Sequence, residues 1–200
     1  MKRITLTLLF ACCTLIVAAQ EDIRVSYRGA RPTVTDFAWA YLSWLDREAD
    51  ECDREGFSAV YSAMLSYRQG QPQDEYSTLT VDEKNGYILY ERNYDGINVS
   101  RVEMCYWNES DGKHKLFAYN QWFYENGKPV GGQYDGLTFF RYNNATKKMS
   151  WCEAPGFDVE FHNTTYTLPR TGKDIIKTKW DDNGGKRQTT LKWNGRRFSR

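Results

Sequence analysis

Residues 117–124 read Phe-Ala-Tyr-Asn-Gln-Trp-Phe-Tyr, and this stretch decides the fold. Side chains of a β-strand alternate between its two faces, so Tyr119 points one way while Trp122 and Tyr124 point the other. A strand that is apolar on both faces is either central in a layered structure or half exposed as a binding surface. We favour burial. If a face is exposed, Tyr119, Trp122 and Tyr124 are the candidate ligand-binding residues, because exposed Tyr and Trp suit sugars and peptides.

Strand-like runs with a period of two surround this stretch from residue 76 to residue 200. Turns rich in Asn, Asp and Gly separate them, and such dipeptides supply the positive φ angles of two-residue hairpins. No long helical pattern lies between the runs, which argues against parallel crossovers. The pattern predicts an antiparallel β-meander over 76–200, either a sheet or a partly closed barrel.

The preceding part, residues 20–75, is predicted to be helical after an extended lead-in. Residues 33–36 offer N-cap candidates, and the segment 46–55 either continues one helix or separates two. Two apolar stripes recur at helical spacing and are typical of core-facing surfaces. Their members are Phe37, Ala40, Tyr41, Trp44 and Leu45, then Phe57, Val60, Tyr61, Met64 and Leu65. The expected fold class is therefore α+β, with an N-terminal amphipathic helix or helix pair packed on the meander in one domain.

An all-β repeat of hairpins is the alternative. Trp107, Tyr142 and Trp180 are each followed by an Asx-rich turn and a basic residue, and they are separated by 35 and 38 residues. That spacing falls in the range of repeat architectures. We favour independent hairpins with similar turn chemistry over a decayed duplication.

The N-terminus indicates export. Lys2 and Arg3 precede an uncharged, mostly apolar run over 4–19, which is the pattern of a secretory signal peptide cleaved before Gln20. No later run approaches the length of a membrane span, so we expect no transmembrane segment after signal removal. A lipoprotein anchored through Cys12 is less favoured because the apolar run continues past that cysteine. We expect a periplasmic or secreted protein.

The charge of the expected mature chain is nearly balanced, which gives no global attraction to nucleic acid. The distribution is uneven: residues 21–75 hold eleven Asp/Glu against six Lys/Arg, and residues 170–200 hold ten Lys/Arg against three Asp. Because the basic residues are spaced singly, we favour solvated or mutually attracting faces over a polyanion-binding patch.

Three cysteines remain after cleavage: Cys52, Cys105 and Cys152. Export favours disulfides. Cys105 and Cys152 both lie in strand-like, aromatic-rich segments and are the predicted disulfide pair, which leaves the fate of Cys52 open.

Residues 180–195, WDDNGGKRQTTLKWNG, first resemble a calcium loop. An EF-hand needs a glutamate at position twelve, where this stretch places Lys192, and its third ligand position is Gly185. A hairpin with its turn at 182–185 fits better. We predict no metal site, no cofactor and no catalytic residue with a recognised motif. The carboxylates that a glycosidase pair would draw on are Asp95, Glu103, Glu109, Asp135 and Glu153.

The chain as a whole resembles the small uncharacterised exported proteins of Bacteroidetes-type Gram-negative bacteria. The resemblance rests on the short signal ending in Ala-Ala-Gln, on the helical part followed by aromatic hairpins, and on the tail segments 168–170, 173–175, 191–195 and Phe198. It implies no activity and assigns no functional residue.

The leading functional hypothesis is an exported, non-enzymatic binding or structural domain of the cell envelope, with a protein, peptide or glycan as its partner. An envelope glycan hydrolase that uses a carboxylate pair is one alternative. An inhibitor or immunity-type protein, which binds through an exposed edge or loop, is another. Whether the protein is an enzyme stays open, and the sequence favours a non-enzyme.

Overall fold

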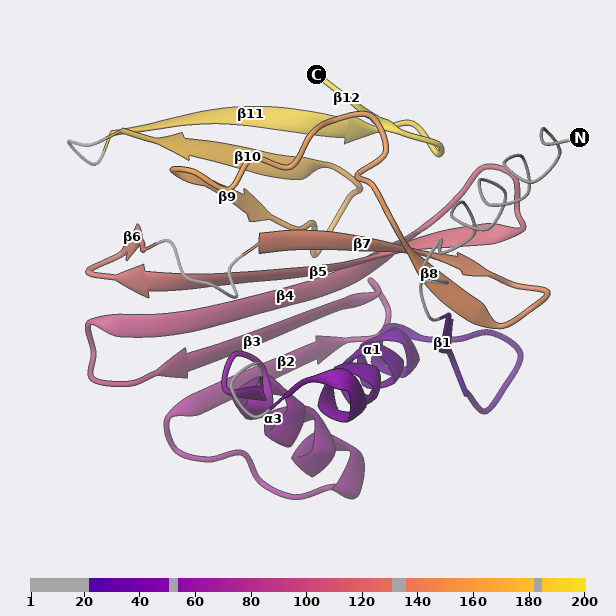
Figure 1. The fold of residues 1–200 in the computed structure, drawn as a ribbon, viewed down its shortest axis with the longest axis horizontal. Helices are drawn as coiled ribbons and strands as arrows, with labels where there is room; N and C mark the ends of the chain where they lie inside the picture. Colours follow the sequence, from indigo (N-terminus) through magenta and orange to yellow (C-terminus); the bar gives the residue numbers. More distant parts are fainter. Residues whose placement is uncertain (1–21, 51–53, 131–135, 182–184) are drawn as a thin grey trace, which may run out of the picture.

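The computed structural model describes residues 22–50, 54–130, 136–181 and 185–200. In these ranges the chain forms three layers, with helices on one side of a large antiparallel sheet and a smaller sheet on the other (Figure 1). Several sequence predictions lie outside the described residues: the signal peptide, Cys12, Cys52, Asp135 and the turn residues 182–184.

The antiparallel strands predicted over 76–200 are present, but they divide between two sheets, and the large sheet also includes a strand from residues 23–24. Its strands are β1 (Ile23–Arg24), β2 (Ser77–Asp82), β3 (Tyr87–Asn93), β4 (Asn98–Asn108), β5 (His114–Glu125), β6 (Lys128–Pro129), β7 (Gly136–Asn143) and β8 (Lys148–Cys152). They are ordered β1-β8-β7-β5-β4-β3-β2, with β6 paired to the end of β5, and every pairing is antiparallel. Strand β5 therefore lies in the middle of the sheet, between β4 and β7.

The smaller sheet comes from the C-terminal part of the chain. It consists of β9 (Thr164–Thr167), β10 (Ile175–Trp180), β11 (Lys186–Trp193) and β12 (Phe198–Ser199), in the order β12-β11-β10-β9. The hairpin predicted for 180–195 is confirmed, because Trp180 pairs with Lys186 and the Asp181 N–H donates to the Gly185 carbonyl over 2.9 Å.

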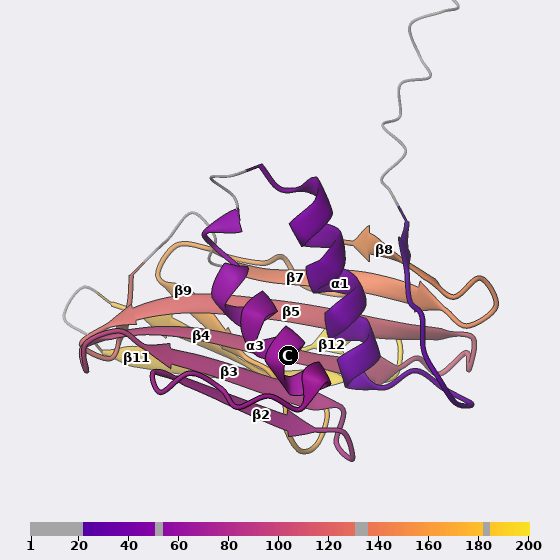
Figure 2. The same ribbon diagram turned by 90° about the horizontal axis from the view of Figure 1, so that it is seen from below.

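The described helices form a pair. Helix α1 (Val34–Glu48) begins at a capping box, in which the Asp36 N–H donates to the Thr33 hydroxyl and the Thr33 N–H donates to the Asp36 carboxylate. Helix α3 (Ser58–Gln69) ends at Gly70, which adopts the left-handed conformation that favours glycine. Both lie across the same face of the large sheet (Figure 2). Neither described helix has the length and apolar character that crossing a membrane requires.

Two cores separate the three layers, and β5 contributes to both. Phe117 and Tyr119 pack under the helices in the first core. Ala118 and Trp122 pack against the smaller sheet in the second core. The expectation that residues 117–124 form a central strand is confirmed. The favoured burial holds for Tyr119, which is 6% exposed, and for Trp122, which is 3% exposed, while Tyr124 is half-buried against the second core. Ligand binding by these three residues stays a prediction.

The three aromatic residues at repeat-like spacing have different environments. Tyr142 is buried in the first core and Trp107 in the second, while Trp180 belongs to neither and donates its indole N–H to the Thr165 hydroxyl. A repeated unit would place equivalent residues in equivalent contacts. The similarity among these hairpins therefore lies in their turn chemistry, and the helix layer excludes the all-β alternative.

Cys105 and Cys152 are both free thiols, which corrects the predicted disulfide. They lie in one row across the sheet, where Cys105 faces Ala118, Ala118 faces Phe139, and Phe139 faces Cys152. Three strand spacings of about 4.8 Å separate their backbones by roughly 14 Å. A disulfide requires Cα atoms within about 7 Å, so this pair cannot form in the folded protein.

Candidate functional site

The carboxylates named from the sequence lie in different environments, and Glu103 is the most buried of those that the structure describes. Its side chain is 2% exposed and lies between the two sheets. The Tyr87 hydroxyl donates to its Oε1 over 2.7 Å, while the Asn120 amide and the Leu168 backbone N–H each donate to Oε2 over 3.0 Å. Glu103 is thus the acceptor at the centre of a buried polar network.

This network joins the two sheets, and its polar groups form hydrogen bonds with one another. Asn120 also donates to the Tyr166 carbonyl and accepts from the Trp122 indole N–H, each over 2.8 Å. Burial raises the pKa of Glu103, and the hydrogen bonds together with Arg101, 3.6 Å away, oppose that shift. Because these partners enclose both carboxylate oxygens, we interpret the network as structural.

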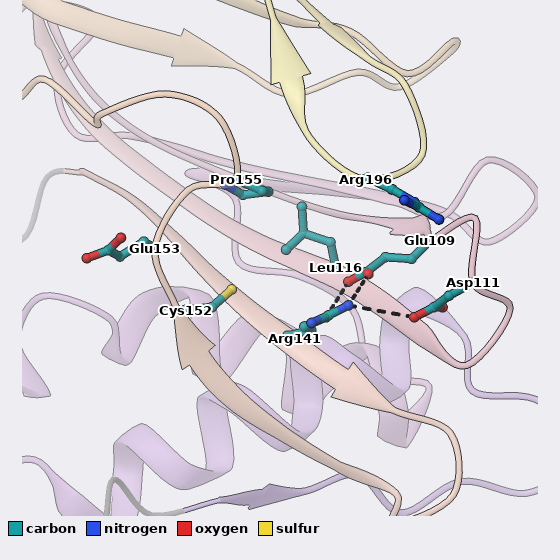
Figure 3. A pocket seen from close by; sticks show the side chains of 8 residues that line it. All are labelled: Glu109, Asp111, Leu116, Arg141, Cys152, Glu153, Pro155 and Arg196. Atoms are coloured by element: carbon teal, nitrogen blue, oxygen red, sulfur yellow. Dashed lines mark hydrogen bonds and ion pairs between the residues drawn. The ribbon is translucent and has the colours of Figure 1, made fainter. Parts of the chain in front are cut away.

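The site open to solvent is a hollow of about 450 Å³ on the β5–β7–β8 part of the sheet, beside the smaller sheet (Figure 3). We call it the charged hollow. It is lined by Glu109, Asp111, Leu116, Arg141, Cys152, Glu153, Pro155 and Arg196. Leu116, Cys152 and Pro155 supply apolar surface, and both signs of charge surround them.

Arg141 of β7 organises one side of the charged hollow. Its Nε and Nη2 atoms donate to the two oxygens of Glu109 over 2.7 and 2.5 Å, and Nη2 lies 3.6 Å from Asp111 (Figure 3). Such two-point pairing fixes both groups in one geometry. The Glu109 side chain is 9% exposed and the Arg141 side chain 49%, so the carboxylate lies beneath the guanidinium.

Glu109, Asp111 and His114 form the one group of possible metal ligands detected among the described residues, with ligand atoms within 4.8 Å of one another. The His114 Nδ1 atom lies 2.6 Å from Asp111, and its Nε2 atom lies 3.3 Å from the Asn143 amide nitrogen. The hydrogen bond from His114 is the largest cause that lowers the pKa of Asp111 well below its usual range. Since Arg141 already places a cation between the two carboxylates, these residues do not fit a metal.

Arg196 enters the charged hollow from a turn that connects β11 and β12. The Asn194 side chain accepts from the backbone N–H groups of Arg196 and Arg197, each over 2.9 Å. Gly195 has a φ of 95°, and an added Cβ would lie 3.1 Å from the Ser110 Cβ. The turn therefore requires glycine where it meets the β4–β5 turn, and the Gly195 carbonyl accepts from the Ser110 N–H over 2.8 Å.

Two charges in the charged hollow remain available to a ligand. Within the described ranges, Arg196 makes a hydrogen bond of 3.3 Å to the Ser110 hydroxyl and no ion pair, and Glu153 is exposed and has no polar partner. Glu153 lies on the side of the hollow away from Asp111 (Figure 3). Between them, burial raises the pKa of the Cys152 thiol to about 11, so the thiol is protonated at neutral pH.

Of the carboxylates named from the sequence, the structure brings Glu109 and Glu153 to one hollow. Asp95 instead accepts backbone N–H groups in the turn before β4, at the opposite end of that strand from Glu109. Sequence reasoning missed Arg141 and Arg196, because neither belongs to a motif. The usable signal was the Asn-Gly turn before Arg196, which marks a position where the backbone approaches another element closely.

Comparison with known proteins gives no information on function, which is therefore inferred from the site. No protein-family model matches the chain, and neither a curated protein nor a solved structure matches it. The fold and the site together define a class: a helix-covered, two-sheet domain with a charged, solvent-open hollow where the large sheet meets the β11–β12 turn of the smaller one.

Proposed function

We propose that this protein is an exported, non-enzymatic binding domain whose ligand occupies the charged hollow. One observation carries the proposal: the reactive groups in the hollow are engaged or protonated, whereas Arg196 and Glu153 can bind by charge. The signal-like residues 1–19 support export. The resemblance to exported envelope proteins supports a partner in the envelope or outside the cell.

The geometry argues against catalysis through the carboxylates. Arg141 holds both oxygens of Glu109 in a two-point pair, and a proton transfer or an attack on a sugar by Glu109 would have to disturb that pair. His114 contacts Asp111 and Asn143, so its ring nitrogens are engaged as well. A glycosidase needs one carboxyl group that donates a proton and a second that activates water or attacks. These contacts favour binding over the hydrolase alternative.

The free groups define the chemistry of the ligand. Arg196 suits a carboxylate, since a guanidinium recognises planar anions through two N–H groups. Glu153 suits hydroxyl or ammonium donors on the same ligand. A hollow of about 450 Å³ accommodates a short saccharide or the end of a peptide chain. The shared ligand chemistry is a carboxylate beside hydrogen-bond donors, as in an acidic sugar or a terminal amino acid.

The test is a binding screen with residues 20–200 against an array of acidic and neutral glycans and a library of peptides with free C-termini. Each hit is then titrated against Arg196→Gln and Glu153→Gln. Lys192→Gln, which lies in the smaller sheet, is exposed and does not line the charged hollow, serves as the control and matches the charge change of Arg196→Gln. Both hollow variants should weaken binding about tenfold, as expected for a lost charge-assisted hydrogen bond.

The arms of the screen separate the two sources of the ligand. Acidic glycans that bind while peptides do not would assign a saccharide, and the reverse would assign a chain terminus. The proposal is wrong if the hits bind both hollow variants as tightly as the control. It is also wrong if a bound glycan is hydrolysed and Glu109→Gln abolishes that turnover.

A further inference from the structure

A second charged region lies on the smaller sheet and has its own set of lining residues. Two hollows of about 440 and 250 Å³ share Glu160, Lys177 and Arg200. We call them together the basic cleft. Five cationic side chains line it, against the two carboxylates Asp158 and Glu160: Lys177, Lys179, Arg187, Arg197 and Arg200.

The strand register brings like charges together in the basic cleft. Lys179 of β10 is directly opposite Arg187 of β11, and Lys177 lies two residues along the same strand face. Directly opposed like charges destabilise an antiparallel pair. The same face buries Ile175 and Leu191 in the second core further along the strands, so the alternation fixes these cations on the side that lines the cleft.

Glu160 offsets only part of this charge. Its carboxylate lies 2.5 Å from the Lys177 Nζ atom and 3.8 Å from the Lys179 Nζ atom. In the part of the chain that the structure describes, Arg187, Arg197 and Arg200 form no ion pair. Arg187 and Arg197 thus line the cleft without a carboxylate partner, while Arg200 acts on Glu160 from beyond ion-pair distance and shares it with the two lysines.

We propose that the basic cleft binds an oligoanionic glycan, one that carries several sulfate or carboxylate groups along its length. Paired guanidinium groups bind such anions through charge-assisted hydrogen bonds. A single-stranded nucleic acid would also need exposed aromatic rings for base stacking. The aromatic rings at the cleft are not free, because Phe198 is 1% exposed and Phe157 packs edge-on against Phe139 and Phe198.

This inference is independent of the proposed function, since the basic cleft shares no lining residue with the charged hollow. The probe is a heparin-derived octasaccharide, titrated calorimetrically into residues 20–200 at low and at physiological ionic strength. A desulfated octasaccharide and a single-stranded DNA of equal charge are titrated in parallel. The variants are Arg187→Gln, Arg200→Gln and their double substitution.

Lys192→Gln is the matched control, because Lys192 is exposed on the opposite face of β11 and its loss changes the net charge equally. Arg187→Gln and Arg200→Gln should each weaken binding of the sulfated octasaccharide about fivefold, the upper end for an exposed charge pair. The control should change binding by less than about twofold, since salt screens distant charges. The desulfated octasaccharide keeps its carboxylates but carries fewer negative charges, so it should bind more weakly than the sulfated one.

Three results would overturn the inference. The first is no binding of the sulfated octasaccharide at low ionic strength. The second is a double variant that binds it as tightly as Lys192→Gln does. The third is tighter binding of the DNA than of the octasaccharide, which would assign the basic cleft to nucleic acid. Unchanged thermal unfolding of the variants verifies that they fold, as expected for exposed side chains.

Discussion

The backbone N–H of Leu168 donates to the Oε2 atom of Glu103 over 3.0 Å. This contact joins residue 103 in the middle of the large sheet to the residue that directly follows β9 in the smaller sheet. A buried carboxylate that accepts from both layers fixes how the sheets stack, because moving either sheet would leave a charged group without its donors.

Replacing Glu103 by Ala should therefore destabilise the fold strongly. Glu103→Ala leaves the Tyr87 hydroxyl and the Leu168 N–H buried without an acceptor, and we expect a loss of roughly 3 kcal/mol or more in the free energy of unfolding. Glu103→Gln retains a carbonyl acceptor and should lose less. Urea unfolding of both variants measures the difference, and equal losses would contradict the role of the network.

The pH dependence of stability should report on the same residue. Because burial raises the pKa of Glu103, folding shifts this group toward its protonated form relative to the unfolded chain. The contribution of Glu103 to stability is then greatest below the usual glutamate pKa of about 4.3 and declines as pH rises through the raised value. The stability of the wild type relative to Glu103→Gln should fall as pH increases from 4 upward. If the stability of the wild type relative to Glu103→Gln instead rises with pH above 4, the raised pKa of Glu103 is contradicted.

Trp122 should behave as a core residue. It is 3% exposed, packs near Tyr166 and donates its indole N–H to Asn120. Trp122→Ala should cost about 3–5 kcal/mol of stability. Trp122→Phe keeps most of the packing and should lose less, mainly through the missing hydrogen bond. Thermal and urea unfolding measure both. A stable Trp122→Ala variant with weakened ligand binding would instead restore the binding-surface interpretation.

The two described cysteines should remain reduced and react slowly. Burial raises the pKa of Cys152 to about 11, and it raises that of Cys105 as well. Alkylation of Cys152 by iodoacetamide in the folded protein should therefore accelerate about tenfold per pH unit between pH 8 and 10, as the thiolate fraction grows. Cys105 should react only after unfolding. Mass spectrometry of the non-reduced protein tests the correction directly, since a Cys105–Cys152 linkage would contradict this fold.

The Glu109–Arg141 pair should show measurable coupling. The pair has two-point geometry, and its carboxylate is 9% exposed. Its coupling energy should therefore exceed that of an ordinary surface ion pair. In a double-mutant cycle with Glu109→Gln and Arg141→Gln, we expect a coupling energy of about 1 kcal/mol that decreases as salt is added. A coupling near zero at low ionic strength would mean that Arg141 is free to bind a ligand as well.

Local sequence pattern was sufficient to predict most of the helices and strands. The alternation of residues 117–124 predicted a strand buried on both faces, Thr33 and Asp36 marked the start of α1, and the Asx-Gly turn predicted the hairpin of β10 and β11. These features depend on neighbours within a few residues, so a single sequence contains them. The cysteine prediction failed because it needed the strand order, which places β5 and β7 between Cys105 and Cys152.

The sequence by itself determined the hairpins, the helical character of the N-terminal part and the two apolar faces of β5, since side-chain alternation and turn conformation are local properties. Only the tertiary structure decided which residues form sites. It placed Arg141 and Arg196, 55 residues apart in the chain, around one hollow and set Lys179 opposite Arg187 in the basic cleft. Charges meet through strand order and register, which follow from how the whole chain buries its apolar surface.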